Sequence, residues 1–204
     1  MWALVESNNV TKVFTRPKGL TIGDVNYPSN IFTMWSASEL EAIGIYAVVI
    51  DNTNFKDSKY YINTDQSFNF ASGTVTASYG TATAKPLDDV LFTAQDETDG
   101  LGTEGEVKQS GIRQGHIDTI NAQAASNLAP TDWMVVRAAE GGTAVPSSIT
   151  TKRAAVRTKA NAMCTQITNA ANVDALATLY AYVNTGTEDS PVYERPLGEL
   201  PLVD

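Results

Sequence analysis

Short runs of β-branched and aromatic residues, separated by Asn, Gly and Pro, fill the chain up to about residue 84. Residues 2–5 and 10–14 flank a turn rich in asparagine, which tolerates left-handed backbone, so we expect a β-hairpin. The continuous apolar run 45–50 favours a strand buried on both faces, although its periodicity also fits a helix. Residues 59–63, 67–71 and 74–79 are expected to complete a meander.

One short helix is expected within this β-rich region. Ser36 offers a side-chain oxygen to the free amides of a first turn, and Glu39 follows three residues later, as in a capping box. Leu40 and Ile43 then give one apolar face, and Gly44 ends the turn.

Apolar residues recur at helical spacing after residue 106. They predict helices over residues 112–128, from Thr131 or Asp132 to 140, from Pro146 to 170, and over 173–183 behind an Asn172 cap. Apolar residues at helical spacing on the third helix form a stripe, which we call the seam, and we expect this face to be buried. The seam comprises Ile149, Val156, Ala160, Met163, Ile167 and Ala170.

Two segments lack a regular pattern. Residues 85–105 are acidic and contain three glycines, which is typical of a solvated linker. Residues 184–204 contain three prolines that prevent a helix, so this C-terminal segment is expected to be extended or irregular. The sequence therefore predicts an α+β protein: a small, mainly antiparallel β-domain (1–84), a linker (85–105), a helical domain (106–183) and an extended C-terminal segment (184–204).

Composition excludes several classes of protein. The 204 residues carry 14 Lys and Arg against 23 Asp and Glu, a net charge of −9, which disfavours general nucleic-acid binding. A single cysteine, Cys164, forbids an internal disulfide and a cysteine-ligated zinc cluster. No apolar run approaches the roughly 20 residues of a membrane-spanning helix. The N-terminus lacks the pattern of a signal peptide. We therefore expect no metal, no cofactor and no membrane partner.

Candidate catalytic chemistry is sparse, and we expect no enzymatic activity. Residues 100–105 match the glycine spacing of a dinucleotide-binding loop, but the surrounding carboxylates would repel a pyrophosphate, which favours an acidic linker. His116 is the only histidine, and no nucleophile motif accompanies it, so a helical packing role is favoured over a catalytic one. Cys164 adjoins the apolar seam and is expected to pack as a small hydrophobe.

Binding surfaces are the stronger hypothesis. Four basic residues lie on the long helix with no acidic residue between them, and they form either a stripe for an acidic partner or a solvated face. Apolar residues of the C-terminal segment need another surface, either on a neighbouring subunit or on the chain's own β-domain, and the alternative is that they pack on their own domain. The candidate interface residues are Trp133, Arg137, Lys152, Arg153, Arg157, Tyr193, Leu197 and Leu200.

Two stretches carry a resemblance to a known family. Residues 128–137 (LAPTDWMVVR), followed by GTAVP at 142–146 and KRAAVR at 152–157, resemble the C-terminal module of bacteriophage tail-fibre assembly and tail-assembly chaperone-like proteins. In that family a T-D-W helix start precedes a helix with an R-A-A-x-R-like motif. Residues 27–32 and 35–46 look like the N-terminal module of small phage tail-associated proteins.

The resemblance implies a structural component of a bacteriophage tail or tail fibre, located in the virion tail and in the host cytoplasm during synthesis. Its partners would be other tail or fibre proteins, or further copies of itself. The alternative is a tail-fibre assembly chaperone that is absent from the mature particle, and a more remote one is a small hydrolase or transferase. Proline-stiffened chain loses little entropy on docking, which makes residues 184–204 a plausible clasp.

Overall fold

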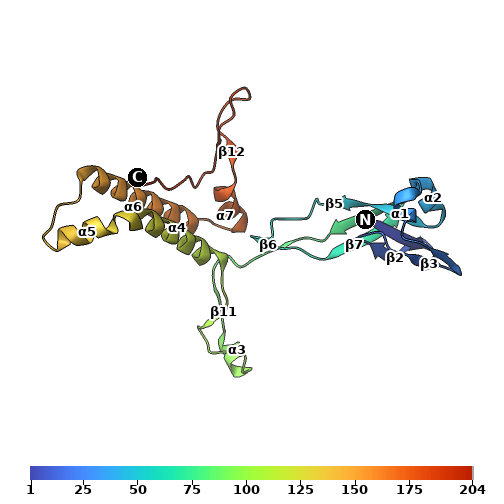
Figure 1. Cartoon of the computed structure of the whole chain (residues 1–204). Helices are drawn as coiled ribbons and strands as arrows, with labels where there is room; N and C mark the ends of the chain where they lie inside the picture. Colours follow the sequence, from blue (N-terminus) through green and yellow to red (C-terminus); the bar gives the residue numbers. More distant parts are fainter. Residues whose placement is uncertain (204) are drawn as a thin grey trace. The chain divides into compact units, whose positions relative to one another are not determined.

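The main sheet of the chain precedes its long helices, and the chain has the α+β fold that the sequence predicts (Figure 1). The structure is a computed structural model that describes residues 1–203. It divides into two compact units, residues 1–83 and residues 84–204, each with buried apolar residues of its own.

The N-terminal unit is built on a five-stranded sheet. Its strands are β1 (Trp2–Glu6), β2 (Asn9–Phe14), β5 (Ile45–Asp51), β7 (Gln66–Ala71) and β8 (Thr74–Tyr79), in the order β2-β1-β5-β8-β7. Only β5 and β8 pair in parallel, so the sheet is mainly antiparallel, as predicted. The predicted first hairpin is confirmed: Ser7 and Asn8 at its turn have φ of 49° and 63°, which matches the twist of the flanking strands.

Short elements pack against strands β1, β2 and β5 of this sheet: the ribbon β3 (Leu20–Ile22) with β4 (Val25–Tyr27), and the helices α1 (Ile31–Met34) and α2 (Ala37–Ala42). The predicted capping box of α2 is present, with the Glu39 amide donating to Ser36 Oγ and the Ser36 amide donating to the Glu39 carboxylate at 2.8 Å. The core of the unit comprises Leu4, Phe14, Leu20, Ile31, Phe32, Leu40 and Ile45.

Two expectations for this unit are wrong. Strand β5 is buried only at its start, because Ile45 lies in the core whereas Val49 and Ile50 are exposed by 55% and 47%. Of residues 59–63, only β6 (Tyr61–Ile62) is a strand, and it belongs to a separate two-stranded sheet outside the main one. Strand β9 (Thr83–Ala84) lies where the chain passes into the second unit.

The segment expected to be an irregular linker is instead ordered. Strand β10 (Val90–Leu91) pairs with β11 (Val107–Gln109), and α3 (Ala94–Thr98) lies between them. We call residues 90–109 the acidic hairpin. Thr93 and Asp96 form a capping box for α3, and Lys108 Nζ reaches Asp96 at 2.6 Å. A Cβ at Gly102 would collide with the Phe92 ring, so the glycine permits close packing here.

The helical part contains α4 (Ile112–Leu128), the 3₁₀ turn η1 (Ala129–Thr131), α5 (Asp132–Ala139), α6 (Ser147–Thr168) and α7 (Val173–Tyr180). Helices α4 and α6 lie side by side (Figure 1). The predicted seam of α6 is confirmed from Val156 to Ala170, and Ile120 and Ala124 of α4 are also buried. The Asn172 side chain caps α7, as expected, by accepting from the Ala175 amide at 2.8 Å.

Helix α7 ends at Tyr180, before the predicted residue 183, because Ala181 is extended. The C-terminal segment then forms a small hairpin of β12 (Val183–Asn184) and β13 (Tyr193–Glu194) instead of fully irregular chain. Beyond it, the Leu197 amide donates to the Leu179 carbonyl at 3.0 Å, and the Leu197 side chain is fully buried. Asn127 Nδ2 donates to the Pro201 carbonyl at 3.1 Å. The segment therefore docks on its own helical unit.

Candidate protein-protein interface

Arg153 joins the two sequence motifs that carry the family resemblance. Its side chain extends from α6 to the junction of α4, η1 and α5, where Nη1 donates to the Leu128 carbonyl at 2.8 Å and to Thr131 Oγ1 at 2.6 Å. Nη2 reaches Asp132 Oδ1 at 2.7 Å. Only 9% of Arg153 is exposed. The arginine donates a second hydrogen bond to a helix-end carbonyl that Thr131 Oγ1 also contacts, and it fixes where α5 begins.

Helix α5 exposes apolar side chains to solvent. Trp133 and Val136 are each 55% exposed, and Val135 is 42% exposed. The Arg137 guanidinium lies 4.8 Å from the centroid of the Trp133 ring, a cation–π contact that holds the indole in place. Exposed tryptophan with a stacked arginine is typical of the residues that anchor protein interfaces.

A shallow groove adjoins this helix. It has a volume of about 270 Å³ and is lined by Val135, Val145, Thr150, Arg153 and Arg157. We call it the α5–α6 groove. Its valines give it an apolar floor, and Arg157 adds an exposed positive charge that has no hydrogen-bond or ion-pair partner within residues 1–203. The groove therefore suits an apolar side chain accompanied by a carboxylate.

The structure places the predicted interface residues in three settings. Trp133 and Arg137 lie together on α5, Arg157 lines the α5–α6 groove, and Lys152 is exposed on the same helix as Arg157. Two of the predicted residues are buried within the helical unit: Leu197 is fully covered, and Arg153, which is 9% exposed, reaches the surface only where it lines the groove.

The other two candidates lie in the C-terminal segment. Tyr193 is 64% exposed and lines a separate pocket of about 320 Å³ with Tyr182 and Arg195. Leu200 is half-buried. Sequence reasoning missed Val135 and Val145 of the groove. The consecutive pair Val135-Val136 was the available signal, since neighbouring positions on a helix point in different directions and cannot share one buried face.

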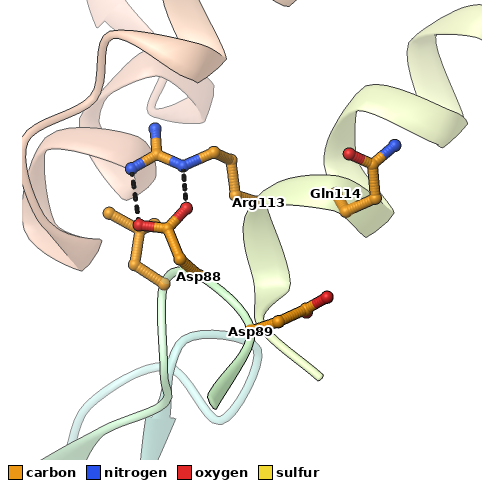
Figure 2. A pocket seen from close by; sticks show the side chains of 5 residues that line it. Asp88, Asp89, Arg113 and Gln114 are labelled. Carbon is orange, nitrogen blue, oxygen red and sulfur yellow. Dashed lines mark hydrogen bonds and ion pairs between the residues drawn. The ribbon is translucent and has the colours of Figure 1, made fainter. Parts of the chain in front are cut away.

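A second polar cluster holds the acidic hairpin to the helices (Figure 2). Arg113 Nε donates to Asp88 Oδ1 at 2.5 Å, and Nη2 donates to Oδ2 at 3.2 Å. This hydrogen bonding lowers the pKa of Asp88. Arg113 Nη1 also donates to the carbonyls of Ile167 and Thr168 at the end of α6. Asp89 accepts from the Gly111 amide at 2.7 Å. The cluster serves the fold, because each of these charged groups already has a protein partner.

The remaining chemical candidates have packing contacts. The His116 ring lies 4.7 Å from that of Tyr180, between α4 and α7. Cys164 Sγ donates to Asn121 Oδ1 at 3.6 Å, and burial raises the pKa of its thiol, which reduces its reactivity. The glycine-spaced stretch 100–105 leads into β11 rather than into a helix, so it lacks the helix N-terminus that a pyrophosphate requires.

Within residues 1–203, no three or more His, Cys, Asp or Glu side chains are grouped so that they could hold a metal ion. Over the same residues, no helix has the length and apolar character needed to cross a membrane. Comparison with protein-family models, with curated proteins and with solved structures found no match.

Proposed function

We propose that the chain is a non-enzymatic structural component of a bacteriophage tail or tail fibre, and that it acts through protein-protein contacts in the virion. The observation that supports this role is the position of the exposed residues on α5. Trp133 and Val136, each 55% exposed, lie in the same stretch, 128–137, that resembles the phage family. Exposed apolar side chains that are grouped on one helix are more typical of an interaction surface than scattered ones are.

The buried Arg153 adds to this argument. It fixes the start of α5 through Thr131 and Asp132, so the backbone that carries Trp133 is positioned before any partner arrives. A preorganised surface loses little conformational entropy on binding. We therefore interpret the two motifs as parts of one interface. Arg153 of the second motif (152–157) supports the helix surface that the first motif (128–137) exposes.

An assembly chaperone that leaves before the particle matures is the second candidate. One observation favours keeping it: residues 197 and 201 dock on the chain's own helical unit, so the order of the C-terminal segment requires no permanent partner. Both roles use the α5 surface, and they differ in whether the chain remains in the particle.

Quantitative mass spectrometry of purified particles, from a phage that encodes the chain, tests the proposal. We expect peptides of the chain in fixed stoichiometry to the tail proteins. Absence from particles, together with recovery in tail-fibre complexes from infected cells, would favour the chaperone. Absence from both would overturn the proposal.

The variant Trp133→Ser tests the α5 surface in the same system. We expect it to reduce incorporation at least about ten-fold, because large aromatic anchors dominate interface energetics. Met34→Ser is the matched control, since Met34 is 74% exposed on the N-terminal unit and its loss removes a similar apolar surface. Equal incorporation of both variants would show that α5 is not the contact surface.

A further inference from the structure

The tip of the acidic hairpin exposes Leu101, a large apolar side chain, among carboxylates, while Val90, Leu91 and Val107 are exposed in its strands. Leu101 is 61% exposed, between Gly100 and Gly102. Four carboxylates of the hairpin have no lysine or arginine in an ion pair with them within residues 1–203: Glu97, Asp99, Glu104 and Glu106. This surface has the composition that the α5–α6 groove is suited to bind, an apolar side chain with negative charge around it.

The tip of the hairpin is ordered by its own contacts. The Leu101 amide donates to the Asp96 carbonyl at 2.8 Å, and Asp96 is paired with Lys108. The Phe92 ring packs on Gly102 from the strand side. Leu101 is therefore held outward on a fixed loop, which lowers the entropy cost of inserting it into a partner.

The two complementary surfaces belong to different ends of the helical pair. Arg113 connects the base of the hairpin to the α6 carbonyls of Ile167 and Thr168. The groove is lined by Thr150 and Arg157 in the first half of α6. At 1.5 Å per residue, these α6 positions lie about 15–27 Å from that end along the helix axis. Within residues 1–203 of one chain both surfaces remain exposed, and over those residues Arg157 has no ionic partner.

We propose that the acidic hairpin of one copy of the chain docks in the α5–α6 groove of a second copy, with Leu101 against the groove valines and hairpin carboxylates beside Arg157. The contact is heterologous, so each copy offers one hairpin and one groove and association can continue into rings or open chains. This inference does not rest on the proposed role in a phage tail, because it concerns the free protein alone.

Sedimentation of the purified full-length protein over a range of concentrations tests the proposal. We expect association that grows with concentration and weakens as salt is raised, since the contact includes exposed charges. Leu101→Ser and Arg157→Glu should each weaken it at least about ten-fold. The matched controls are Leu202→Ser, at a leucine 65% exposed, and Lys18→Glu, at an exposed lysine of the N-terminal unit. Both should associate like the unchanged protein.

Mixing the two variants gives the sharpest result. Leu101→Ser retains an intact groove and Arg157→Glu retains an intact hairpin, so an equimolar mixture should form one-to-one dimers and nothing larger. A monomeric unchanged protein at every concentration would overturn the proposal, as would a mixture that stays monomeric. Loss of association in only one of the two variants would also overturn it, because the hairpin and the groove would then not be each other's partners. Circular dichroism of each variant checks that both exposed-site changes leave the fold intact.

Discussion

Arg153 shows how one buried charge can set the position of a surface helix. Its guanidinium donates to a carbonyl, a hydroxyl and a carboxylate, from Leu128, Thr131 and Asp132. Thr131 Oγ1 in turn donates to the Leu128 carbonyl at 2.9 Å. Removal of the arginine would leave these acceptors in a partly buried site without their donor, and such a loss costs more than the bond itself contributes.

We therefore expect Arg153→Ala to reduce the free energy of unfolding by about 2–4 kcal/mol. The matched control is Arg157→Ala, one turn further along α6 at an exposed position, which should change stability by less than about 0.5 kcal/mol. Urea unfolding followed by circular dichroism measures both values. Equal effects of the two substitutions would contradict the structural role of Arg153.

The elements of the chain differ in how far their sequence predicts them. The α6 seam and the α2 capping box were predictable because each depends on residues a few positions apart, namely Val156 to Ile167 and Ser36 with Glu39. The order of the acidic hairpin could not be predicted in this way. It depends on the ion pair between Asp96 and Lys108, twelve residues apart, and on the packing of the Phe92 ring against Gly102. Composition alone indicated a solvated segment there.

The candidate interface divides in the same way. The exposed Trp133 and the half-buried Arg137 are predicted from the motif, and their spacing of four residues places them on one helix face. The sequence does not predict the burial of Arg153, because a charged residue in a basic run is usually solvated. Only the tertiary structure brings Leu128, Thr131 and Asp132 to this side chain.

The acidic hairpin should show a distinct response to pH. Lys108 and two hydrogen bonds from Thr93 lower the pKa of Asp96 to about 2, from a usual value of 3.8. A lowered pKa in the folded state contributes stability that is complete above the unfolded value and is lost as pH falls from 3.8 to about 2. We expect the β10–β11 pairing to loosen over that range.

Carboxyl carbon chemical shifts measured by NMR during an acid titration check this prediction. The Asp96 carboxyl should titrate near pH 2, and Lys108→Met should move its pKa upward, because the largest cause of the shift is removed. A residual shift should persist in that variant, since the Thr93 hydrogen bonds remain. An Asp96 pKa at the usual 3.8 in the unchanged protein would contradict the Lys108 pairing.

At the scale of the whole molecule, the chain consists of two units with separate apolar cores. The N-terminal core is centred on residues such as Phe14 and Ile45, and the helical unit buries Met163, Ile167 and Leu176. Leu197 brings the C-terminal segment into the second of these cores. The stability of the helical unit is therefore expected to depend on residues far along the chain from its helices.

Leu197→Ala tests this dependence. The substitution removes a fully buried side chain, which typically costs about 2–5 kcal/mol, and the loss should fall on the helical unit alone. Amide hydrogen exchange should then become faster in α4, α6 and α7, while the amides of β1 and β8 keep their protection. Leu202→Ala, at a leucine 65% exposed, is the matched control and should change neither set. Faster exchange in β1 and β8 as well would show that the two units unfold together, because only cooperative unfolding would carry a defect from one core to the other.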